Sequence, residues 1–287
     1  MMTAEKWYSV TWKCYYIEES MTRYRQLFTP RWLAGHVLAL TLIALFLSLG
    51  AWQLRRLDQR QTYNALLESR LEAQPQPFDL LREEYNLGAP EDVETSAAYR
   101  RAQVTGRFDP EREVLLRSRA LDGQPGYHVL TPLVLDDNRA LLVDRGWVPF
   151  ELDEPPIAQA APPTGEVSVT GILFPAQEQP VGFGPKDPAE GELDAVFFVN
   201  TERLEQQLPY RLEPIYLELN QQNPPQTAQL PVPPVPPELT EGSHFGYALQ
   251  WFSFAAIGII GYGFLMRSVL KDDGQDDEDI VSTAQAS

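Results

Sequence analysis

Two long stretches without acidic or basic side chains constrain this sequence more than any other feature. They cover residues 32–54 and 245–266, and His36 is the one residue in them whose side chain gains a charge near neutral pH. A helix needs about 20 apolar residues to cross the hydrocarbon core of a bilayer, and both stretches are long enough. The alternative is two helices buried in a soluble core, which so complete a lack of charge disfavours. The sequence therefore predicts a membrane protein with two transmembrane α-helices.

The charges that flank these stretches predict the topology. Arg267 and Lys271 follow the second stretch, whereas Glu238 and Glu241 precede it. Basic residues near a span end favour the cytoplasm, so we expect both termini there and the intervening segment outside. The predicted organisation is a cytoplasmic segment 1–31, a transmembrane helix 32–54, an extracytoplasmic domain 55–243, a transmembrane helix 245–266 and an acidic cytoplasmic tail 267–287.

The N-terminal region favours an anchor that is kept. No small-residue cleavage site follows the first stretch, so a removed signal peptide is not expected. The short basic sequence that begins at Met21 is typical of the segment before such an anchor. We therefore hypothesise that translation starts at Met21 instead of Met1 or Met2. A bacterial inner membrane is the simplest location.

The segment between the two stretches has the pattern of a β-rich domain. Short runs of β-branched and aromatic residues alternate with turn residues, at 99–105, 113–118, 127–135, 140–148, 166–174, 196–199 and 215–219. Residues 136–138 predict a hairpin turn, and Thr201 is expected to be the N-cap of a helix. Helical spacing should continue from the first span to just before Pro75. We expect an α+β domain that is antiparallel and barrel- or sandwich-like, followed by a stiff proline-rich spacer over 224–237.

Composition excludes several functions. The chain has 23 Lys+Arg against 40 Asp+Glu, a formal net charge of -17, so a nucleic-acid partner is not expected. A single cysteine, Cys14, rules out a disulfide oxidoreductase and, with no methionine between 22 and 265, disfavours copper(I) delivery by the outer domain. None of the common catalytic strings G-x-S-x-G, H-E-x-x-H or G-x-x-x-x-G-K-[ST] occurs, so we expect a protein that is not an enzyme.

The three histidines remain as candidates for metal binding. His128 alternates within a predicted strand, where a hydrogen-bonded structural role is expected. His36 and His244 are expected at opposite faces of the membrane, too far apart to share a ligand. His244 begins a helical face that it shares with Tyr247, Ala248 and Trp251, and Trp52 and Gln53 lie across from it at the end of the first span. This pattern fits an aromatic interface belt and equally a histidine ligand for haem iron.

Five segments resemble the Surfeit locus protein 1 family, the assembly factors of haem-copper cytochrome c oxidase. They occur in the order of that family and include LGAWQLRRLDQR, GYHVLTPL, LLVDRGWVP and HFGYALQWFSFA; the full set is 49–60, 99–119, 126–133, 141–149 and 244–256. The resemblance implies two membrane helices around an extracytoplasmic, strand-rich domain. It also implies a role in the maturation of oxidase subunit I, with binding and delivery of haem a in bacterial members.

The resemblance also suggests a site. His244 falls on the haem-associated histidine of the family, and Tyr247 and Trp251 fall on matching positions. We therefore expect haem a as a transiently bound cargo, with His244 as iron ligand and Tyr247, Trp251, Trp52 and Gln53 around it. The implied partners are subunit I of cytochrome c oxidase and the lipid bilayer, with haem a synthase and other oxidase assembly factors as further candidates.

Three alternatives remain open from the sequence. The chain could be a structural chaperone of subunit I that does not bind haem, or an extracytoplasmic solute sensor. Arg145 or Arg55 could pair with the carboxylates of haem, because guanidinium groups favour carboxylates. For Arg145 the expectation is instead a turn residue stacked on Trp147.

Overall fold

The structure is a computed structural model that describes residues 27–85, 87, 96–136, 138–178 and 183–271. It divides into two compact units, Met1–Tyr63 with Thr240–Ser287, and Asn64–Leu239. The hypothesis of translation from Met21, and Cys14 and the acidic residues after Lys271, lie outside the described residues.

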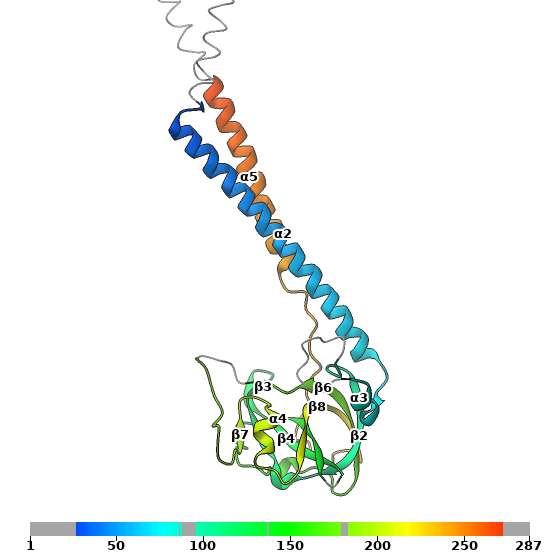
Figure 1. Cartoon of the computed structure of the whole chain (residues 1–287). Helices are drawn as coiled ribbons and strands as arrows, with labels where there is room; N and C mark the ends of the chain where they lie inside the picture. Colours follow the sequence, from blue (N-terminus) through cyan, green and yellow to red (C-terminus); the bar gives the residue numbers. More distant parts are fainter. Residues whose placement is uncertain (1–26, 86, 88–95, 137, 179–182, 272–287) are drawn as a thin grey trace, which may run out of the picture. The chain divides into compact units, whose positions relative to one another are not determined.

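The first unit contains two long helices that lie side by side (Figure 1). Helix α2 spans Pro30–Glu72 and helix α5 spans His244–Lys271. Both are long and apolar enough to cross a membrane, and only 6% of the most apolar window of each is buried, unlike the core helix of a soluble protein. Helix α2 continues beyond the predicted span and ends before Pro75, as the helical spacing predicted.

Small residues let these two helices approach closely. Gly50 of α2 and Ala248 and Ala255 of α5 are buried. A Cβ atom added at Gly50 would lie 2.7 Å from the ring of Phe252, so no side chain fits there without movement. Membrane helices commonly pack through such small residues, because lipid supplies no hydrophobic drive for their association.

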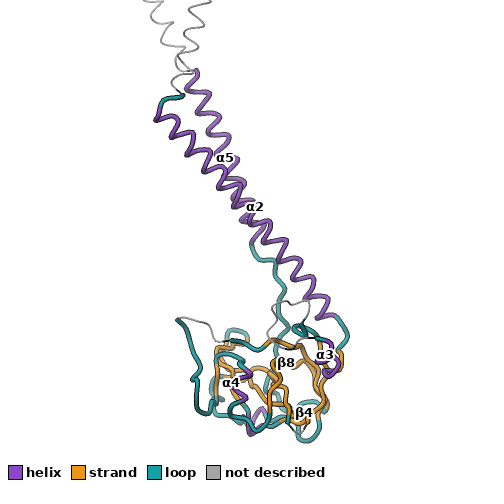
Figure 2. The backbone as a smooth tube through the Cα atoms, viewed as in Figure 1, coloured by secondary structure: helices purple, strands orange, loops and turns teal. Residues whose placement is uncertain are grey.

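The second unit is the predicted β-rich domain, and its described part has eight strands in one sheet (Figure 2). The strands are β1 (Gln76–Pro77), β2 (Arg101–Phe108), β3 (Val114–Leu121), β4 (Gln124–Asp136), β5 (Arg139–Pro149), β6 (Val167–Pro175), β7 (Ala195–Val196) and β8 (Arg211–Asn223). The helical elements are α3 (Phe78–Glu84), η2 (Pro110–Arg112), η3 (Ala158–Ala160) and α4 (Thr201–Glu205).

Five of these strands close into a barrel. The sheet order is β1-β2-β6-β8-β5-β4-β3-β7, and an additional antiparallel pairing of β2 with β4 joins the ring. The expected barrel-like sheet is therefore confirmed, but its pairing is mixed: β5 pairs with β8 in parallel. A parallel pair needs a long crossover, and the chain between β5 and β8 provides one that includes β6, β7 and α4.

The strands bury side chains on both faces of the barrel wall. Leu141 and Leu217 belong to the cluster inside the barrel, whereas Leu142 and Tyr216, their neighbours in sequence, belong to a second cluster that includes Leu204 of α4. Alternation along each strand produces this division. The N-cap of α4 is Asn200, whose side chain accepts the backbone N–H of Arg203. The prediction of Thr201 as N-cap was wrong by one residue, because Asn200 supplies the better-placed acceptor.

The connections after β4 and β8 differ in how well they were predicted. Asp136 pairs with Arg139, so the predicted hairpin between β4 and β5 is confirmed. The proline-rich segment, by contrast, folds back onto the domain, because Val232 exchanges backbone hydrogen bonds with Trp147 at 2.7 and 2.9 Å. Gly146 permits this close approach: it has φ +116, and a Cβ there would lie 2.0 Å from the carbonyl oxygen of Val232.

Candidate functional site

His244 and Gln53 are in direct contact in the helix unit. His244 Nδ1 lies 2.9 Å from Gln53 Oε1, so the first residue of α5 is joined to the middle of α2. Gln53 is buried and His244 is half-buried. An amide oxygen only accepts, so a neutral imidazole donates its Nδ1 proton here and keeps a lone pair on Nε2. A histidine held in this way is suited to bind a metal through Nε2.

His244 also lines a cleft of about 430 Å³. The lining residues come from one face of α2 and from the segment that enters α5: Arg56, Gln59, Arg60, Tyr63, Thr240, Glu241, Gly242 and His244. The four residues of α2 follow the i, i+3, i+4, i+7 spacing of a single helix face. The volume lies within the range of small-molecule sites, about 300–1,000 Å³.

Polar contacts hold the two walls of this cleft together. Arg60 Nε donates to the carbonyl oxygen of Thr240 at 3.3 Å, and Gln61 Nε2 donates to Glu241 Oε1 at 3.0 Å. Gly242 has φ +69, and a Cβ there would lie 3.6 Å from His244 Nε2. The positive φ therefore explains why a glycine stands at the turn into α5.

The cleft has an excess of positive charge. Arg56 Nη1 donates to the side-chain amide oxygen of Gln59 at 3.4 Å, and Arg60 lies 5.8 Å from the ring centre of Tyr63. Within the described residues neither guanidinium forms an ion pair with a carboxylate. Two arginines thus face one carboxylate, that of Glu241, in a chain whose net charge is -17.

The predicted aromatic residues are not all close to His244. Trp251 stacks on Phe46 of α2 with ring centres 5.8 Å apart and an interplanar angle of 24°. Trp52 is 48% exposed and Tyr247 is 50% exposed. In the described residues neither makes a ring contact or side-chain hydrogen bond with His244, so their placement fits an aromatic belt. Of the predicted site, the structure thus joins His244 with Gln53 and leaves Trp52 and Tyr247 outside that contact.

The other two histidines have structural partners. His36 hydrogen-bonds the hydroxyl group of Tyr262 and, at 3.0 Å, the carbonyl oxygen of Leu27. His128 Nδ1 lies 2.8 Å from Asp144 Oδ2, which confirms the expected hydrogen-bonded strand histidine. Within the described residues, no group of three or more His, Cys, Asp or Glu side chains could hold a metal ion.

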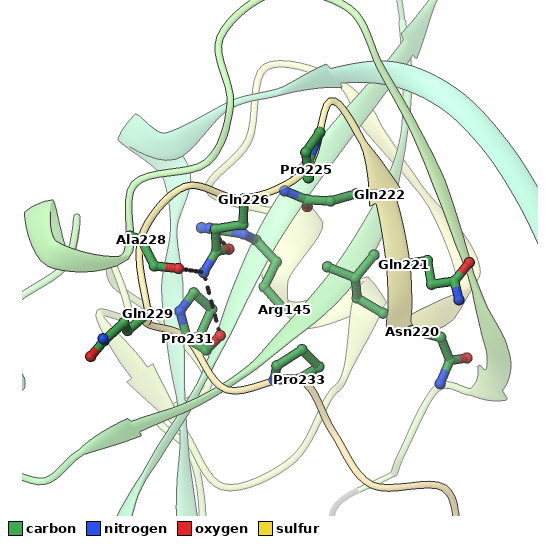
Figure 3. A pocket seen from close by; sticks show the side chains of 11 residues that line it. Arg145, Asn220, Gln221, Gln222, Pro225, Gln226, Ala228, Gln229, Pro231 and Pro233 are labelled. Atoms are coloured by element: carbon green, nitrogen blue, oxygen red, sulfur yellow. Dashed lines mark hydrogen bonds between the residues drawn. The ribbon is translucent and has the colours of Figure 1, made fainter.

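Arg145 lies in the β-rich domain beside a second cavity of about 430 Å³. Figure 3 shows its side chain pointing toward Gln226, in the loop that follows β8. Its Nη2 donates to the Ala160 carbonyl oxygen at 2.6 Å and to Gln226 Oε1 at 3.2 Å, while the guanidinium lies 5.4 Å from the ring centre of Phe108.

These contacts correct two expectations for Arg145. It is a fully buried residue of β5 that packs over Phe108, not a turn residue stacked on Trp147. Burial lowers the pKa of Arg145 to about 10, although nearby Glu113 acts in the opposite direction. The acceptors of its own domain hold this guanidinium, so it is not a candidate for binding haem carboxylates.

Sequence reasoning missed Arg56 and Arg60. It named Arg55, which does not line the cleft, although Arg55 is adjacent in the chain. Helical arithmetic contains the missing signal, since Gln53, Arg56 and Arg60 follow the i, i+3, i+7 rule and Arg55 does not. The contact between Gln53 and His244 shows which face of α2 borders the cleft.

Comparisons with known protein sequences find relatives over most of the chain. The model of the SURF1 family matches residues 40–256. A SURF1-like protein of Mycobacterium tuberculosis is 31% identical over 258 residues, which cover 88% of this chain and 89% of that protein. A SURF1-like protein of Rickettsia felis is 24% identical over 82% of this chain and 98% of its own length. The cytochrome oxidase assembly protein SHY1 of Saccharomyces cerevisiae is 30% identical over 131 residues, 45% of this chain and 31% of the yeast protein.

Proposed function

The chain belongs to the SURF1 family, and from this membership we propose that it is a membrane-anchored assembly factor for haem-copper cytochrome c oxidase. In this proposal it binds haem a as a transient cargo and passes it to subunit I, without catalysing a reaction itself. Its similarity to the yeast cytochrome oxidase assembly protein SHY1 supports the assembly role. The contact between His244 and Gln53 is the observation that supports haem binding.

The residues of the cleft fit a haem group. Haem iron is commonly held by a single protein histidine, and His244 offers Nε2 while Gln53 orients the ring through Nδ1. Haem also combines an apolar ring with two carboxylates. The helix pair offers the same combination, because apolar spans meet a polar, arginine-bearing cleft at His244. When bound, haem a would supply the redox-active iron that the oxidase needs, and this chain would bind and orient it.

The two helices also give the proposal a location. In the proposed location, an inner membrane of a bacterium, the basic residues after the second span favour both termini in the cytoplasm and the β-rich domain outside. In that orientation His244 lies at the outer end of its span. Release of cargo to subunit I, and contacts with haem a synthase or other assembly factors, would then take place at this membrane face.

An optical spectrum of the purified full chain, co-expressed with the enzymes of haem a synthesis, tests this function. We expect a haem a band in the wild type and its near-complete loss in His244→Ala. Gln53→Ala should weaken binding by about tenfold, as is usual for a residue that orients a metal ligand. His36→Ala is the matched control: it removes the other histidine of the same unit and should leave the band unchanged.

Each outcome of this experiment has a distinct meaning. A well-folded wild type without bound haem would favour the structural chaperone of subunit I. A band that persists in His244→Ala would retain haem binding and remove His244 as the ligand. Equal losses in His244→Ala and His36→Ala would mean that both substitutions act by disturbing the helix pair.

A further inference from the structure

We propose that Arg56 and Arg60 bind the two carboxylates of the porphyrin cargo and thereby select a haem whose carboxylates are free. This inference rests on the proposed function, because it assigns residues to the same cleft. It moves the carboxylate partners of the cargo from Arg145 and Arg55 to two residues that the structure places beside His244.

The first observation is that the two arginines lie on one face of α2. Gln53 marks the level of His244, and Arg56 and Arg60 follow on the same helix face, about 4.5 Å and about 10 Å farther along the axis. A ligand held by His244 Nε2 and extending along this wall therefore meets one guanidinium after the other. Both arginines and His244 line a single cleft.

The second observation concerns the hydrogen bonds that the two guanidinium groups make. Arg60 uses Nε for the Thr240 carbonyl oxygen and Arg56 uses Nη1 for Gln59, so each retains further N–H donors. Within the described chain, neither group has a carboxylate partner in an ion pair. Guanidinium groups bind carboxylates with paired, charge-assisted hydrogen bonds, so two such groups match a dicarboxylate ligand.

Glu241 is the one acidic residue among those that line the cleft. Its carboxylate lines the cleft and would repel an anion, but its Oε1 accepts a hydrogen bond from Gln61, on the same wall as the arginines. Two positive charges against one negative charge leave the cleft attractive to an anion with two carboxylates. The acidic chain as a whole repels anions, so this local excess is what distinguishes the cleft.

The phosphate of an anionic lipid has a related chemistry and could reach arginines at a membrane surface. The shared feature is an oxyanion that accepts from guanidinium donors. We assign the cleft to the porphyrin because its arginines line the same cleft as His244. The Nε2 lone pair of His244 can bind the iron of a porphyrin, whereas a lipid phosphate offers no group for it to bind. The experiment below separates the two ligands.

The test is a titration of the purified full chain in phosphatidylcholine nanodiscs with ferric haem and with its dimethyl ester, followed by the Soret band. The ester keeps the iron and the ring but has no free carboxylates. We expect the wild type to bind the acid more tightly than the ester by on the order of tenfold or more. Arg56→Gln and Arg60→Gln should each weaken binding of the acid, and the double variant should bind acid and ester equally.

Arg55→Gln is the matched control, since it removes the same charge one residue away and outside the cleft lining. It should leave the preference for the acid unchanged. Equal affinity of the wild type for acid and ester would overturn the inference while leaving haem binding by His244 intact. An equal effect of Arg55→Gln would also overturn it, because the effect would then be one of general charge.

A comparison of two nanodisc lipids tests whether the arginines bind lipid phosphate instead. If the arginine variants alter haem affinity in phosphatidylglycerol nanodiscs but not in phosphatidylcholine nanodiscs, the two arginines serve lipid phosphate and the inference is wrong. If the wild type binds neither porphyrin, the proposed function fails first and this inference fails with it. Loss of haem binding in His244→Ala with an unchanged acid-to-ester preference in the arginine variants would separate the two claims.

Discussion

Arg145 and Glu113 form an ion pair in the interior of the β-rich domain. Arg145 Nη1 lies 3.4 Å from Glu113 Oε2, and the two side chains are 0% and 1% exposed. Glu113 also accepts from the backbone N–H of Ile157 at 2.9 Å and from the Thr131 hydroxyl group at 3.1 Å. The pair thus connects the start of β3 with β4, β5 and the segment that leads into η3. Its hydrogen bonds offset the cost of burying two charges.

Removal of one member of this pair should destabilise the domain strongly. In Glu113→Leu the charge of Arg145 stays buried without its counter-ion, which costs about 3–5 kcal/mol of unfolding free energy. Urea denaturation of the full chain measures this through the fluorescence of Trp147, the one tryptophan between residues 64 and 239.

A surface ion pair is the control for this prediction. Arg112 Nη1 lies 3.5 Å from Glu192 Oε1, with side chains 42% and 72% exposed. Arg112→Met should cost less than about 1 kcal/mol, because water screens exposed charges. A similar cost for Arg112→Met and Glu113→Leu would contradict the structural role of the buried pair.

The sequence predicted the elements of this fold better than their partners. Lack of charge located both long helices, and alternation located the strands, because these are local properties of the chain. The parallel pairing of β5 with β8 could not be predicted, since it depends on a crossover of some sixty residues whose path no local pattern records. The burial of Arg145 was missed for the same reason: its partner Glu113 lies 32 residues away.

The candidate site, too, was predicted only as far as local features of the sequence allow. His244 and Gln53 were predicted together because each stands at the end of an apolar stretch. Arg55 was named because it follows the span directly, whereas Arg56 lines the cleft, and only the contact between His244 and Gln53 shows which face of α2 borders that cleft. Trp52 was included because it lies across from His244 and Tyr247 because it falls on a matching position of the family, yet aromatic residues also suit a membrane interface.

The carboxyl group of Glu218 should make the stability of the β-rich domain depend on pH. Burial raises its pKa to about 7, with a further contribution from Asp144, while Arg119 acts in the opposite direction. The ordinary value is 4.5, so between about pH 4.5 and 7 the folded state binds more protons than the unfolded state. The unfolding free energy should therefore fall as pH rises through this window, by about 2–3 kcal/mol.

Urea denaturation of the wild type and Glu218→Gln at pH 5 to 8 checks this sign. The variant keeps a neutral side chain at every pH, so its unfolding free energy should decrease less and should exceed that of the wild type at pH 8. Burial also raises the pKa of Glu113, so a smaller decrease of the same sign should remain in the variant. Glu151→Gln, at an exposed position, should leave the wild-type dependence unchanged. A wild type that becomes more stable between pH 5 and 7 would refute the assignment.

A larger side chain at Gly50 should separate the helices that form the candidate site. A Cβ there would already lie 2.7 Å from the Phe252 ring, so Gly50→Leu forces α2 and α5 apart one turn before Gln53. Overpacking of this kind costs about 1–3 kcal/mol, and we expect haem affinity to fall by about tenfold as Gln53 withdraws from His244. The Soret titration and the thermal unfolding of the full chain measure the two effects. Gly35→Leu is the control, because nothing lies within 4 Å of a Cβ at Gly35. It adds the same volume to the same helix, and an equal loss of affinity there would mean that close packing at Gly50 does not position the histidine.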